Sequence, residues 1–140
     1  MSEIYQMALL KLAGRASGAG RLDNPDGTAT VNNPMCGDRI TVDIRVDDNS
    51  TIRELAHDAR ACLVCQASAS VLGKAAIGKT VSELASVADQ LDDMLKNGGA
   101  VPVGDDWQDY QSFDAVIDHT SRHNCVLLPF EALKEAAEDN

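Results

Sequence analysis

The feature that most constrains this chain is the run Cys36-Gly37-Asp38, which leads directly into an alternating stretch at residues 39–47. A glycine separates the thiol from the carboxylate, and it lets the backbone turn sharply enough for both side chains to face one point. Every second residue of the stretch is apolar, namely Ile40, Val42, Ile44 and Val46. This period of two predicts a half-buried strand of an antiparallel sheet, so we expect the turn to be anchored in a core.

A second strand is expected at residues 51–61, after a polar turn at residues 47–50. A hairpin of these two strands would bring the Cys36 end of the first strand close to Cys62. We infer that four side chains converge on one metal or cluster site, namely Cys36, Asp38, Cys62 and Cys125. Thiolates bind zinc and iron well, whereas a carboxylate oxygen matches these metals less well. Asp38 is therefore expected to be the weak, exchangeable ligand.

Helical spacing of apolar residues predicts a first helix within residues 4–13 and another after Cys62. Residues 80–83 form a capping box that opens a third helix. The glycine-rich end of residues 1–20 is expected to be a flexible connector between the first helix and the sheet. Residues 28–31 are expected to form a short strand.

The C-terminal part is expected to hold a short helix at residues 107–119 and a final helix that runs to about Ala137. Proline suits the first turn of a helix, so Pro129 would mark the start of that final helix. Cys125 would then lie just before the helix N-terminus, where the dipole and free amides favour thiolate over thiol.

Length and composition limit the number of domains and the classes of function that this chain can have. A chain of 140 residues with 44% apolar residues predicts a single domain over residues 1–140. The net charge of −10 argues against binding to nucleic acid and to anionic membranes. We see no secretory signal and no apolar stretch of membrane-spanning length. Four cysteines in such a chain suggest thiols or metal ligands in a reducing cytoplasm.

Two residues near the predicted site have alternative interpretations. Cys65 forms a Cys-x-x-Cys pair with Cys62, but a lone helical cysteine of this kind is more often buried than a ligand. His123 is a possible ligand beside Cys125, or it points elsewhere. His123 and Cys125 also allow another function class, an enzyme in which His123 activates Cys125 as a nucleophile. Such an enzyme would lack an apparent orienting acid, and it would leave Asp38 unexplained.

Taken together, the motifs resemble the IscU/SufU/NifU family of iron–sulfur cluster assembly scaffolds. The resemblance is carried by residues 33–38 (Asn-Pro-x-Cys-Gly-Asp), by Cys62 followed by Ala-Ser-Ala-Ser at residues 67–70, and by Ile-Gly-Lys-Thr at residues 77–80. It continues to Cys125 followed by Glu-Ala-Leu at residues 131–133, and Tyr5 resembles the family's N-terminal tyrosine.

This resemblance implies an α+β fold with a small three-stranded antiparallel sheet and helices packed on one side. It implies a non-enzymatic scaffold that takes sulfur from a cysteine desulfurase, assembles a transient [2Fe–2S] cluster, and passes it to apo-proteins. The implied ligands are Cys36, Asp38, Cys62 and Cys125, with Cys125 as persulfide acceptor. The SufU branch implies an alternative, in which zinc occupies the same site and the protein accepts sulfur from its desulfurase. As a zinc-dependent sulfurtransferase the chain would be an enzyme.

Several positions depart from the family pattern. Ala61 replaces the glycine that normally precedes the second cysteine, and Cys65 is additional. Residues 120–124 replace the proline-containing approach to the third cysteine. The Leu-Pro-Pro-Val-Lys motif for chaperone docking is absent, which argues against recognition by a dedicated chaperone. The branch within the family stays open.

Overall fold

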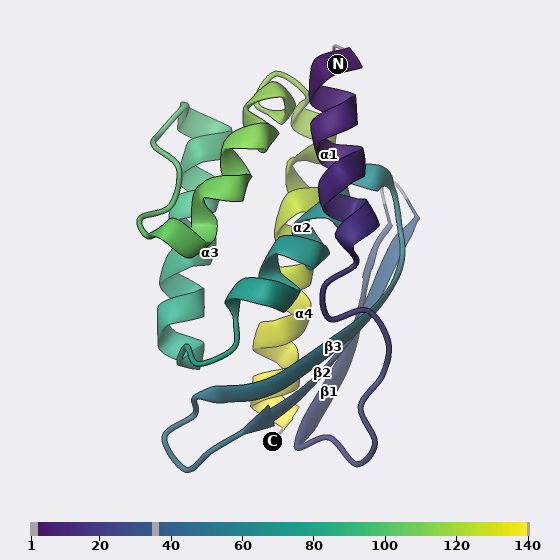
Figure 1. Cartoon of the computed structure of the whole chain (residues 1–140), viewed down its shortest axis with the longest axis vertical. Coiled ribbons are helices and arrows are strands. Elements are labelled where there is room, and N and C mark those ends of the chain that lie inside the picture. The colour runs from purple at the N-terminus through teal and green to yellow at the C-terminus, as the bar shows by residue number, and fades with distance from the viewer. Residues whose placement is uncertain (1–2, 35–36, 140) are drawn as a thin grey trace.

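A computed structural model describes residues 3–34 and 37–139 of the chain. The α-helices are α1 (Glu3–Arg15), α2 (Leu63–Ala75), α3 (Val81–Asn97) and α4 (His123–Asp139), and the strands are β1 (Gly27–Asn33), β2 (Asp38–Val46) and β3 (Ile52–Arg60) (Figure 1). Two 3₁₀ helices, η1 (Asp105–Val116) and η2 (Thr120–Arg122), lie between α3 and α4.

The three strands form one antiparallel sheet in the order β1-β2-β3. The alternating residues of β2 bury their apolar side chains as predicted, because Ile40, Val42 and Ile44 are all 0% exposed. Residue Arg39 of β2 pairs with Arg60 of β3, so the start of β2 lies beside the end of β3. The predicted hairpin is therefore confirmed.

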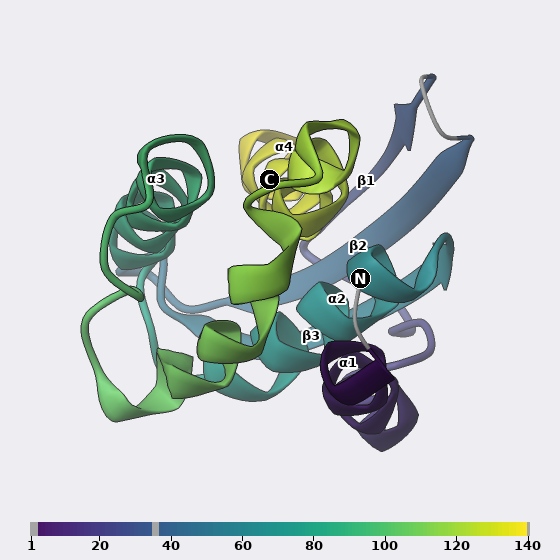
Figure 2. The ribbon, with the colours of Figure 1, turned by 90° about the horizontal axis from the view of Figure 1, so that it is seen from above.

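The helices cover the sheet in two layers. Both α2 and α4 pack against strands, whereas α1 packs on α2 and α3 packs on α4. Figure 2 shows α1 and α3 on the outside of this arrangement. The expected α+β fold, with a three-stranded antiparallel sheet and helices on one side, is confirmed. No helix in the described ranges combines the length and the apolar character needed to cross a membrane.

The segment after α1 is held more firmly than the expected flexible connector. The amide of Gly20 donates to the carbonyl of His57, and the amide of His57 donates to the carbonyl of Gly18, both at 2.8 Å. The Nε2 atom of His57 lies 2.8 Å from the carbonyl oxygen of Ser17. This segment therefore pairs with the outer edge of β3, and glycine content alone does not reveal such long-range pairing.

The helix expected at residues 107–119 is the 3₁₀ helix η1, which begins and ends earlier. Its buried side chains Trp107, Tyr110 and Phe113 form an aromatic cluster with Phe130 of α4. Four of the chain's five aromatic residues thus attach η1 to α4.

Candidate metal centre

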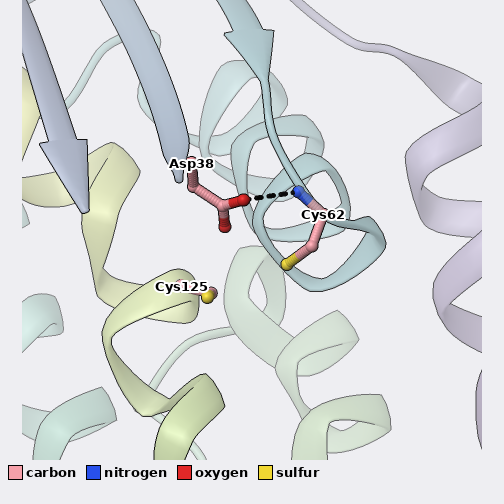
Figure 3. A group of neighbouring side chains, drawn as sticks. All are labelled: Asp38, Cys62 and Cys125. Atoms are coloured by element: carbon pink, nitrogen blue, oxygen red, sulfur yellow. Dashed lines mark hydrogen bonds between the residues drawn. The ribbon is translucent and has the colours of Figure 1, made fainter. Parts of the chain in front are cut away.

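Three of the four predicted ligands meet at one end of the sheet. Ligand atoms of Asp38, Cys62 and Cys125 all lie within 4.8 Å of one another. Figure 3 shows the three side chains converging from β2, from the start of α2 and from α4. Cys36 lies outside the described residues, so its place in the site stays a prediction.

Strand pairing places the first two groups. Asp38 is the first residue of β2, and Cys62 follows the end of β3 and occupies the N-cap position of α2. The backbone amide of Cys62 donates a hydrogen bond to Oδ1 of Asp38 at 2.9 Å. Gly37 precedes Asp38 with φ of +73°, a left-handed conformation that glycine adopts without strain. The sharp backbone turn that the sequence predicts at Gly37 is therefore present directly before Asp38.

The third group comes from α4, but the helix begins earlier than predicted. It starts at His123, so Cys125 lies within its first turn instead of before it, and Pro129 lies inside the helix. The prediction failed because a proline inside a helix is unusual: it cannot donate a hydrogen bond to the carbonyl four residues earlier. Packing of α4 against β1 and β2 stabilises the helix despite this loss.

Two cysteine sulfurs of the site differ in their access to solvent. Cys125 is 0% exposed, and the side-chain amide of Asn33 donates toward its sulfur at 4.0 Å. Asn33 is itself buried and faces Asp38 in the β1–β2 register. Cys62, in contrast, is half-buried. A reagent can thus approach Cys62 from outside, while Cys125 lies behind it in the core.

Arg122 is a neighbour of the site that sequence reasoning missed. Its side chain and Cys62 line the same groove. Electrostatic attraction to Cys62, and to a smaller extent to Cys125, raises the pKa of Arg122. The spacing of three residues between Arg122 and Cys125 could have indicated that Arg122 lies near the site, because residues so spaced share a helix face.

The remaining candidate residues lie apart from the site. Cys65 is 0% exposed within α2 and does not belong to the ligand cluster found among the described residues. His123 is buried, and its Nε2 lies 2.8 Å from the carbonyl oxygen of Ile117. This contact favours a structural role for His123 over a ligand role.

The donor set fits a thiophilic metal. Two thiol sulfurs and a carboxylate supply three ligands within coordination reach of a common centre, and zinc and iron accept this mixture. A fourth ligand would complete a tetrahedral site, and Cys36, which directly precedes Gly37 in the sequence, is the predicted fourth ligand. The arrangement can hold a metal ion or a small cluster.

Comparisons with known proteins agree with this arrangement. A family model described as NifU-like N terminal domain matches residues 4–126. The chain is 28% identical over 136 residues to the iron–sulfur cluster assembly scaffold protein IscU of Streptococcus pyogenes, covering 97% of this chain and 84% of that protein. It is also 28% identical over 105 residues to the zinc-dependent sulfurtransferase SufU of Bacillus subtilis, covering 75% and 70% of the two chains.

A solved structure shows the same similarity in three dimensions. The crystal structure of a nitrogen-fixing NifU-like protein (N-terminal) from Brucella abortus matches with a TM-score of 0.89 and 34% sequence identity. The match covers 99% of this chain and 96% of that one. The resemblance inferred from the motifs is confirmed, and the chain belongs to the NifU-like N-terminal domain family.

Proposed function

We propose that this protein is a scaffold for iron–sulfur cluster assembly. It binds iron and sulfide as a transient [2Fe–2S] cluster on Cys36, Asp38, Cys62 and Cys125, and transfers the cluster to apo-proteins. The observation that carries the proposal is the convergence of Asp38, Cys62 and Cys125 within 4.8 Å. The IscU relative from Streptococcus pyogenes, aligned over 97% of this chain, supports it.

The chemistry of the site suits a cargo that must leave. Cysteine sulfurs hold iron strongly, and the harder carboxylate oxygen of Asp38 is the ligand that is exchanged most readily. The sulfur would come from a cysteine desulfurase, and the clients would be apo iron–sulfur proteins. A reducing compartment such as the cytoplasm would keep the thiols available. In this role the protein is not itself an enzyme.

The second candidate is a zinc-containing sulfur acceptor that works with a cysteine desulfurase. It is favoured by the SufU relative from Bacillus subtilis and by a donor set that also fits tetrahedral zinc. In this role zinc would be retained, and the protein would act as a zinc-dependent sulfurtransferase. The ligands would be the same four residues.

Anaerobic reconstitution separates the two functions. The metal-free protein is incubated with ferrous iron and sulfide, and then analysed by visible absorption and by iron, sulfide and zinc content. The scaffold function predicts a cluster spectrum with iron and sulfide in equal amounts. Zinc that resists replacement, with no cluster spectrum, would favour the sulfur acceptor.

Two variants locate the ligands in the same assay. Cys62→Ser should abolish stoichiometric cluster binding, because it removes a sulfur from the converging group. Cys65→Ala is the matched control, since Cys65 is buried three residues further along α2 and lies outside that group. Full occupancy in Cys62→Ser would contradict the assigned site.

A further inference from the structure

We propose that Arg122 is a positioning residue that binds the anionic sulfur of an incoming persulfide, and that Cys62 is the thiol that receives this sulfur. The inference rests on the proposed function and extends it to the route by which sulfur enters the site. It assigns a role to Arg122 and moves the acceptor role from Cys125 to Cys62.

A groove leads from the surface to Cys62. It has a volume of about 570 Å³ and is lined by α1, by the first residues of α2 and by Arg122. Its apolar walls include Met7 and Leu10, which are 69% and 62% exposed. Among the described residues that line it, the only charged side chains are Glu3 and Arg122. A small anion that enters this groove therefore meets a cation next to a cysteine sulfur.

Accessibility distinguishes the two described cysteines of the candidate site. Cys62 lines the groove and is half-buried, whereas Cys125 is 0% exposed and does not line it. Arg122 lines the same groove as Cys62. Of these two cysteines, an incoming persulfide can reach Cys62 directly, and Arg122 is in place to hold it.

Arginine suits this task. Its guanidinium group stays charged at physiological pH and presents several N–H donors in a fixed plane, so it can contact the Cys62 sulfur and an incoming anion together. Hydrogen bonds from a charged donor to an anion are stronger than neutral ones. A lysine would keep the charge but lose the planar set of donors.

The transfer step balances without any other reactant. In the metal-free protein, the thiolate sulfur of Cys62 attacks the outer sulfur of the donor persulfide. A new S–S bond forms at Cys62, the S–S bond of the donor breaks, and its electron pair leaves on the donor's inner sulfur as a thiolate. The outer sulfur, now the terminal sulfur of a Cys62 persulfide, remains beside Arg122.

The first test measures anion preference at Cys62. Iodoacetate is an anion and iodoacetamide is neutral, so the ratio of their alkylation rates cancels changes in thiolate fraction and in accessibility. Peptide mass spectrometry of metal-free protein should show this ratio falling about tenfold in Arg122→Gln and only partly in Arg122→Lys. Arg53→Gln is the control, because it removes the same charge at a place remote from Cys62. Arg53 lies near the opposite end of β3, in an ion pair with Asp47. An unchanged ratio in Arg122→Gln would overturn the role of Arg122.

The second test follows sulfur itself. Glutathione persulfide is mixed with metal-free wild type, and the added sulfur is located by non-reducing mass spectrometry. Sulfur should appear first on Cys62, about tenfold more slowly in Arg122→Gln, with partial recovery in Arg122→Lys. Sulfur that appears first on Cys36 or Cys125, or no uptake by the wild type, would overturn the inference. Reconstitution with inorganic sulfide does not use this step, so its outcome tests the scaffold function separately.

Discussion

The backbone amide of Cys62 donates a hydrogen bond of 2.9 Å to Oδ1 of Asp38, so one ligand of the candidate site fixes the position of another. Asp38 is only 4% exposed, and the amide belongs to the residue that caps α2. The carboxylate thus has a structural task, which is to join the start of β2 to the start of α2. Its proposed task as a metal ligand is separate from this structural task and can be tested independently.

Two substitutions at Asp38 should separate these tasks. Asp38→Asn retains an oxygen that accepts from Cys62, whereas Asp38→Ala removes the acceptor and leaves the half-buried amide of Cys62 without it. We expect Asp38→Ala to lower the free energy of unfolding of the metal-free protein by about 1–3 kcal/mol. Asp38→Asn should lower this free energy by clearly less, when both variants are unfolded with urea. Equal losses in the two variants would show that the hydrogen bond contributes little.

His57 should make stability depend on pH. Burial lowers its pKa below the ordinary value of 6.5, against the opposing effects of Ser17 and Asp58. Below pH 6.5 the unfolded chain therefore binds a proton more readily than the folded one, so stability is complete above this pH and falls as the pH drops toward the folded-state pKa. The loss is limited to about 1.4 kcal/mol per pH unit for one proton.

The measurement is the free energy of unfolding between pH 7.5 and 5.5 for wild type and His57→Gln. The pH dependence of the wild type should be clearly reduced in His57→Gln. His119→Gln is the control, because His119 is exposed. An identical pH dependence in wild type and His57→Gln would exclude His57 as its source.

Gly73 should tolerate no side chain. A Cβ at this position in α2 would collide with the carbonyl oxygen of Ser17, in the segment that pairs with β3. We expect Gly73→Ala to destabilise the protein by about 1–3 kcal/mol, as overpacking in a core does. In Gly14→Ala the new Cβ meets no heavy atom of the described residues within 4 Å. That variant should be neutral, or more stable by up to about 1 kcal/mol, because alanine favours helix. Thermal unfolding of both variants tests the contact.

The parts of the fold that follow from local patterns were predictable. The alternation in residues 39–47 gave the buried face of β2, and the capping box gave the start of α3. There the hydroxyl of Thr80 accepts from the amide of Glu83 at 3.1 Å, and Gly98 ends the helix in a left-handed conformation. These features depend on neighbouring residues, which a single sequence displays.

The features that were missed depend on tertiary packing. Pro129 lies inside α4 because the helix packs against the sheet, and local sequence patterns do not reveal this packing. The segment after α1 is ordered by hydrogen bonds to His57, which is distant in the sequence. At the site, the order of the motifs predicted that Asp38, Cys62 and Cys125 would meet. The proximity of Arg122 to Cys62 depends on the position of η2 relative to α2, which the sequence does not display.

The measurement that tests the central claim most directly is cluster transfer from the reconstituted protein to an apo-ferredoxin, followed by visible circular dichroism. Wild type and Asp38→Asn are loaded equally with iron and sulfide, and the rate at which the ferredoxin gains its cluster is recorded. If Asp38 is the exchangeable ligand, the wild type should hand over its cluster faster, and Asp38→Asn should remain folded and retain its cluster longer. Equal transfer rates, or a wild type that forms no cluster to transfer, would contradict the account.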